Sequence, residues 1–137
     1  MTKSTQNKPN TVQNRSNNNY ELEYSPYDLP DQYPVKVIHS YEQKDSPIEQ
    51  LHLHNVFEVG ICHSGTGIFV VENKILPFKS GDISFISNRE FHLARSTPGS
   101  TSQWSFIMFD PARLCVSYPQ LSESVPVRDF SGPGLEN

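Results

Sequence analysis

Three histidines and one glutamate stand at spacings that allow them to form one site. His52 and His54 alternate along a run of strand-forming residues, so both side chains point to the same face. On a straight strand Glu58 would lie roughly 13 Å further on. We therefore expect a bend near Asn55, a residue that tolerates turns, and a second strand that returns Glu58 to the histidines. Together with His92, these side chains form a plausible site for Zn, Fe, Mn, Ni or Cu.

Short strands are the elements that must position these side chains. Runs of strand-forming residues separated by turn signals predict strands over residues 35–41, 48–54, 57–62, 68–71, 75–78, 83–86, 91–95 and 103–109. Many short strands at regular spacing indicate an all-β sandwich or barrel. After the last strand, Asp110 suits a helix N-cap and Pro111 the first helical position, which predicts a short helix start.

Composition sets the limits of the domain. The 137 residues allow one domain, and their hydrophobic fraction is only 35%. The hydrophobic fraction is low largely because residues 1–19 form a polar head, which we expect to be disordered. Residues 20–34 are rich in tyrosine and proline, which predicts an extended arm on the surface. Whether this arm covers a ligand or is a loose extension is left open.

Charge and cysteine content narrow the function classes. The net charge is -4 and no basic stripe is visible, so we do not expect this piece to hold DNA by itself. No apolar run has the length that a signal peptide or a membrane span needs. Cys62 and Cys115 are predicted to be free thiols in a cytoplasmic protein.

The spacing of the ligand-type residues resembles the cupin superfamily. His-x-His, three residues, Glu, six residues and Gly, here His52 to Gly65, is the spacing of the first cupin motif. Gly81 to His92 follows the second motif, with Ser87 where cupin enzymes usually have Pro and Arg89 where they usually have Gly. The Asn that often follows is replaced by Ser96. The resemblance implies a cupin-type double-stranded β-helix, a jelly-roll barrel, over roughly residues 35–115.

Within that superfamily the chain resembles the N-terminal domains of AraC-type bacterial transcription regulators. The matching pieces are His52 to His54, Phe57-Glu58, the Ser64 to Gly67 turn, Gly81-Asp82 and the segment 104–111. The resemblance implies a barrel that binds a small effector, followed by helices that dimerise and by two helix-turn-helix units that bind DNA. Those later parts do not fit after Pro111, so we expect a homodimer interface and DNA contact to depend on missing segments.

These observations lead to a division of the chain and to two hypotheses. We expect an arm over 1–34, a cupin effector-binding domain over 35–115, and a linker or truncated start of the dimerisation region over 116–137. The first hypothesis is an effector-sensing module without enzymatic activity. The alternative is a stand-alone metal-dependent cupin enzyme, a dioxygenase or isomerase.

The roles of single residues follow the same division. The predicted effector-binding residues are His52, His54, Glu58, His92, Trp104 and Phe106, and the first four are also the predicted ligands of a divalent metal, if one is bound. Metal binding, effector contact and a purely structural role for the histidines are left open. Trp104, Phe106 and Met108 share one strand face, which is typical of core. His39 and His63 are predicted to be surface residues, and Cys62 a small buried thiol.

Overall fold

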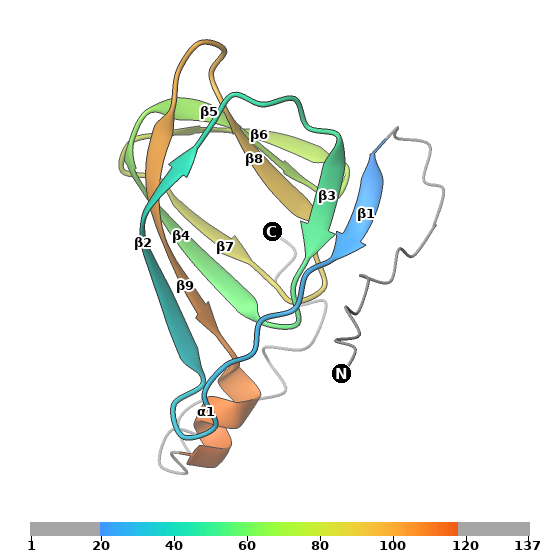
Figure 1. Ribbon diagram of the computed structural model, residues 1–137, viewed down its shortest axis with the longest axis vertical. Helices are drawn as coiled ribbons and strands as arrows, with labels where there is room; N and C mark the ends of the chain where they lie inside the picture. Colours follow the sequence, from blue (N-terminus) through green and yellow to red (C-terminus); the bar gives the residue numbers. More distant parts are fainter. Residues whose placement is uncertain (1–19, 118–137) are drawn as a thin grey trace, which may run out of the picture.

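The computed structural model describes residues 20–117, in which nine strands precede one short helix (Figure 1). The strands are β1 Glu21–Tyr24, β2 Val35–Gln43, β3 Gln50–Leu53, β4 Phe57–Ser64, β5 Thr66–Val71, β6 Lys74–Lys79, β7 Ile83–Ile86, β8 His92–Ser96 and β9 Ser102–Phe109, and the helix is α1 Pro111–Ser117. Each of the eight predicted strands overlaps an observed one. The predicted helix start is also present.

The strands form two sheets that face each other. One has the order β1-β3-β8-β5-β6 and the other the order β2-β9-β4-β7. All neighbours are antiparallel except β1 and β3, which run parallel. Figure 1 shows the two sheets enclosing a common interior. The predicted all-β barrel is therefore confirmed, with β1 and β6 at the edges of one sheet and β2 and β7 at the edges of the other.

Strand alternation fills the interior. In β9 the even positions Ser102, Trp104, Phe106 and Met108 are buried, while the odd positions are partly exposed. This confirms the predicted core face, because successive strand residues point to opposite sides of a sheet. Cys62 is also buried, as predicted, and burial raises the pKa of its thiol.

The arm contributes a strand that the proline content did not predict. Residues of β1 pair with β3 from Glu21↔Gln50 to Tyr24↔Leu53, at the edge of the sheet. An edge position leaves one side of the strand free of pairing, which suits a segment followed closely by prolines. Beyond β1 the arm runs to the foot of the barrel beside α1 before β2 begins (Figure 1). Leu29, in this stretch, is buried in the core.

Two expectations fall partly outside the described residues. The head over 1–19, for which disorder is expected, lies outside them, as do residues 118–137 of the expected linker. Within the described part, Asp110 caps α1 as its sequence position indicates, since its Oδ1 accepts a hydrogen bond from the Arg113 backbone N–H at 3.1 Å.

Candidate functional site

The four predicted ligand residues converge at one end of the barrel interior. His52 on β3 and His92 on β8 are cross-strand partners, with ring centroids 4.5 Å apart. His54 follows the end of β3, and its ring lies 4.7 Å from that of His52. The side-chain nitrogens of the three histidines lie within 4.8 Å of one another. Glu58 Oε2 lies 3.5 Å from His54 Nε2 and 3.6 Å from His92 Nε2.

The predicted bend between the two strands lies at Asn55. β3 ends at Leu53 and β4 begins at Phe57 in the other sheet, so the chain crosses between the sheets here. The Asn55 side chain accepts a hydrogen bond from the Tyr27 backbone N–H at 2.8 Å and donates one to the Tyr27 carbonyl at 3.0 Å. The bend is therefore fixed by the arm, a contact that the motif spacing does not reveal.

Backbone carbonyls fix the orientation of two of the imidazoles. His54 Nδ1 lies 2.6 Å from the Ser25 carbonyl, and His92 Nδ1 lies 2.9 Å from the Glu90 carbonyl. A carbonyl only accepts, so each Nδ1 carries the proton and donates it. Both Nε2 atoms face the carboxylate of Glu58, which accepts a hydrogen bond from a ring that carries a second proton.

The electrostatics of the cluster reinforce this arrangement. Burial, followed by the neighbouring His92 and His54, lowers the pKa of His52 to about 4, so this ring is neutral at neutral pH. Burial pushes the pKa of Glu58 upward, but the interactions with His54 and His92 outweigh it and lower that pKa to about 2. Glu58 is therefore a buried carboxylate whose negative charge is stabilised by these two rings. Buried charge needs a partner to be tolerated.

A divalent cation fits this donor set. His92 Nε2 is fully buried and has no hydrogen-bond partner among residues 20–117. Imidazole nitrogens about 2.1 Å from a common ion lie at most about 4.2 Å apart, so nitrogens up to 4.8 Å apart need to close by roughly half an ångström. Small side-chain rotations supply such a change. His52, His54 and His92 with Glu58 are the residues that would hold the ion.

The space beside the cluster is small. A cavity of about 90 Å³ is bordered by His52, Glu58 and His92 at one end and by apolar side chains, among them Phe69 and Phe106, at the other. At about 30 Å³ per water molecule, this volume accommodates an ion with a few waters or a very small molecule. Phe106 thus borders the cluster cavity as part of its apolar wall.

A layer of aromatic rings separates this cavity from a larger one. Trp104 stacks on Phe106 with centroids 5.6 Å apart and planes 3° apart. Phe69 meets Trp104 edge-on at 5.4 Å. Phe106 borders the small cavity, Trp104 borders a second pocket of about 450 Å³, and Phe69 borders both. The two aromatic residues predicted as effector contacts therefore border different cavities.

The larger pocket lies between the free edges β6 and β7. It is lined by Phe69, Val71, Glu72, Lys74, Leu76, Pro77, Phe78, Asp82, Ile83, Ser84, Phe85, Ile86, Glu90 and Trp104. Its walls come from β5, β6, β7 and β9 and from the turns between strands. Apart from Asp82 and Trp104, these residues belong to none of the motif pieces that carry the family resemblance, so their convergence on a pocket was not predicted.

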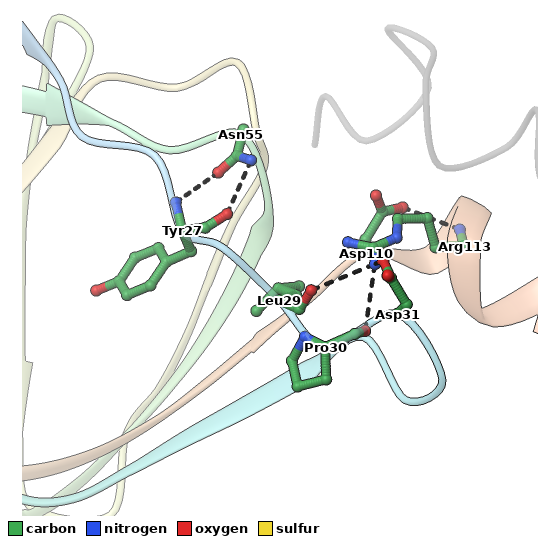
Figure 2. A network of polar contacts seen from close by, with 7 residues as sticks. All are labelled: Tyr27, Leu29, Pro30, Asp31, Asn55, Asp110 and Arg113. Carbon is green, nitrogen blue, oxygen red and sulfur yellow. Dashed lines mark hydrogen bonds and ion pairs between the residues drawn. The ribbon is translucent and has the colours of Figure 1, made fainter.

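The arm is bonded to Asn55 at one end and to Arg113 of α1 at the other (Figure 2). At one end it supplies the Ser25 carbonyl to His54 and the backbone of Tyr27 to Asn55. The Tyr27 ring lies edge-on to His54 at 4.8 Å. At the other end Arg113 of α1 donates to the carbonyls of Leu29 and Pro30 and pairs with Asp31 at 2.9 Å, as Figure 2 shows.

The departures from the second cupin motif leave His92 in place. Ser87 and Glu90 build the turn themselves, since the Ser87 N–H donates to Glu90 Oε2 at 2.8 Å and Ser87 Oγ accepts from the Arg89 N–H at 3.4 Å. His39 and His63 are both exposed, as predicted, and His63 bonds Ser105 Oγ at 2.8 Å.

Comparison with protein families gives one match. Residues 34–129 match the family model of the AraC-like ligand binding domain, which is most of the chain. The chain belongs to this family. An AraC-like ligand-binding domain is a cupin barrel, so the predicted cupin fold is confirmed together with the family. No described helix is long and apolar enough to cross a membrane.

Solved structures similar to this AraC-like domain are cupin proteins. A Cupin 2 conserved barrel domain protein from Salinispora arenicola CNS-205 is 14% identical, with a TM-score of 0.49 over 68% of this chain and 88% of that chain. A predicted oxalate decarboxylase from Thermotoga maritima is 21% identical, with a TM-score of 0.46 over 55% of this chain and 79% of that chain. A cupin protein from Bacteroides fragilis is 17% identical, with a TM-score of 0.47 over 56% of this chain and 64% of that chain. A search of curated proteins gave no match.

Proposed function

We propose that this chain is the small-molecule-sensing domain of an AraC-type transcription regulator. The observation that carries the proposal is the family match over residues 34–129. The barrel also offers a pocket of about 450 Å³, and small-molecule sites commonly measure about 300–1,000 Å³. DNA would be bound by helix-turn-helix units outside this domain, in keeping with the domain's net charge of -4.

The contacts of α1 offer a route by which a bound effector influences such units. α1 is the last described element, and Arg113 ties it to the arm at Leu29 to Asp31. The same arm reaches the histidine cluster through Ser25 and Tyr27. A change at the cluster that moves the arm therefore alters the contacts of α1.

Genome-wide binding and transcript measurements test the regulator role. Chromatin immunoprecipitation of the protein encoded by the full gene should recover discrete DNA sites. Disruption of the gene should change transcripts next to those sites, and the intact gene should restore them. If no DNA site is enriched and no transcript is altered, the proposal is contradicted.

The cluster is proposed to hold a divalent cation in this domain. The support is the set of converging donors, the buried carboxylate of Glu58 and the unpartnered Nε2 of His92. A bound cation would neutralise Glu58 and act as a Lewis acid toward an oxygen or nitrogen atom in the adjoining cavity. The chain itself fixes the rings of His54 and His92 through the carbonyls behind them.

A metal-dependent cupin enzyme is the second candidate function. It is favoured by one observation, the cavity of about 90 Å³ that adjoins the donor set and has space for a very small substrate. Protein loaded with Fe(II) or Mn(II) would be incubated with small hydroxy and keto acids, with oxygen uptake and product masses recorded. Turnover that disappears in Glu58→Gln would support an enzyme. If no turnover is found with any metal or substrate, the sensing function is favoured over the enzyme.

A further inference from the structure

The pocket between β6 and β7 has an aromatic floor. Phe78 meets Trp104 edge-on at 4.9 Å, and Phe69 meets Phe78 at 5.9 Å. All three rings are buried and all three line the pocket. Flat apolar surfaces of this kind favour a flat apolar ligand, since aromatic pairs gain from stacked or edge-on contact as well as from burial.

One unpaired polar atom lies within the pocket wall. Ser84 Oγ is fully buried and has no hydrogen-bond partner among the described residues. Gly60 on the neighbouring strand leaves the space for this hydroxyl, because a Cβ there would lie 2.4 Å from it. A buried hydroxyl without a partner is costly and rare. This oxygen is covered, so a hydrogen-bonding group on a ligand would reach it after the Ser84 side chain rotates toward the pocket.

The carboxylates around the pocket give it a negative balance. Glu72, Asp82 and Glu90 line it, against the single cation Lys74. Asp82 is paired with Lys79 Nζ at 3.5 Å. Glu72 accepts the Phe91 N–H at 2.7 Å, and Glu90 accepts the Ser87 N–H at 2.8 Å. Each of these two carboxylates is thus held in place beside the pocket through one oxygen.

We propose that this pocket binds a small aromatic amine. The ring would lie against Phe69, Phe78 and Trp104, a ring hydroxyl would bond Ser84, and the ammonium group would lie toward Glu72 and Glu90. The inference rests on the proposed sensing function, which it sharpens by naming the class of effector. Anionic aromatics are disfavoured by the same carboxylates.

Three probes of matched shape test the charge preference. Tyramine, tyrosol and 4-hydroxyphenylacetate share a phenol ring and differ in a cationic, neutral or anionic tail. Trp104 is the only tryptophan in the chain, so its fluorescence reports binding at this pocket. We expect saturable binding of tyramine, weaker binding of tyrosol, and the weakest binding of 4-hydroxyphenylacetate.

Variants separate the contribution of the two carboxylates, Glu72 and Glu90, from that of the Ser84 hydroxyl. Glu72→Gln with Glu90→Gln keeps an acceptor for each backbone N–H and should weaken tyramine about threefold to tenfold while leaving tyrosol unchanged. Glu49→Gln, an exposed carboxylate away from the pocket, is the matched control. Ser84→Ala should weaken tyramine about fivefold and leave phenethylamine, which lacks the hydroxyl, unchanged.

Three results would overturn the inference: 4-hydroxyphenylacetate binding as tightly as tyramine, tyramine binding that the double variant leaves unchanged, or no saturable binding by any probe. None of them bears on the regulator role, because chromatin binding and transcript changes are measured without an added ligand. If the protein binds tyramine but shows neither chromatin binding nor transcript changes, the regulator role is contradicted and the amine-binding pocket stands.

Discussion

The two sides of the aromatic layer differ in how their polar groups are held. On the cluster side, His54 and His92 are each fixed by a backbone carbonyl and Glu58 is buried between them. On the other side, the pocket is five times larger in volume (about 450 against about 90 Å³), combines aromatic rings with charged side chains, and contains a hydroxyl without a partner among the described residues. The first has the donor set of the proposed ion, and the second has space for an organic molecule.

Under the proposed functions the two sides would divide the tasks within one barrel. A site of fixed donors discriminates by charge and coordination, whereas a larger pocket discriminates by shape and a few polar contacts. Phe69 is the residue that borders both. Four predictions, each with a measurement, test this contrast between the two sides.

Phe69→Ala should have the largest effect, because it opens the layer that separates the two cavities. Phe69 is 6% exposed and packs on Trp104 and Phe78. Loss of a buried Phe side chain costs about 3–5 kcal/mol, to be measured by urea unfolding. Phe85→Ala, at a position 45% exposed, is the control and should cost far less. Equal losses would mean that the layer does not support the barrel.

The contrast also shows which parts of the molecule could be predicted from sequence. The cluster is encoded by spacing within residues 52–58 and by one later histidine, so its four members and the bend at Asn55 could be found. The pocket could not be found in this way, because its residues lie on separate strands and most of them belong to no motif. β1 could not be predicted either, because its pairing with β3 depends on tertiary contact and not on local propensity.

Acid should destabilise the cluster side specifically. The pKa of His52 falls from 6.5 to about 4 on folding, so the unfolded chain takes up this proton first and stability is lost as the pH falls from 6.5 to 4. The pKa of Glu58 falls from 4.5 to about 2, so the stability from its carboxylate is present above pH 4.5 and is lost as the pH falls toward 2. At 1.36 kcal/mol per unit, His52 accounts for about 3 kcal/mol.

This pH effect is measured by chemical unfolding of chelator-treated protein between pH 7 and pH 4. His52→Gln removes the titrating group, so the loss over this range should largely disappear. Ser84→Ala, on the other side of the layer, should retain the full loss. A pH dependence unchanged in His52→Gln would assign it to other groups.

Metal binding should be confined to the cluster side. His92→Ala removes one donor and should lower zinc affinity by at least about a hundredfold, a free-energy change of about 2.7 kcal/mol. His63→Ala, which replaces an exposed histidine outside the cluster, should bind zinc like the unaltered chain. Calorimetric titration of tag-free protein gives both values. Equal zinc binding by the two variants, or none by the unaltered chain, would exclude a metal site at these residues.

Release of the arm should have the smallest effect and should act through the cluster. Asn55→Ala removes the two hydrogen bonds to Tyr27 and should cost about 1–2 kcal/mol, with faster proteolysis within residues 20–34. Because the same arm carries the carbonyl behind His54, zinc affinity should fall about tenfold. Asn55→Asp keeps the acceptor for the Tyr27 N–H, so its stability and zinc affinity should lie between those of the unaltered chain and of Asn55→Ala. Faster proteolysis with unchanged zinc affinity would mean that the arm covers the cluster without orienting it, and the route from cluster to α1 would then have to lie elsewhere.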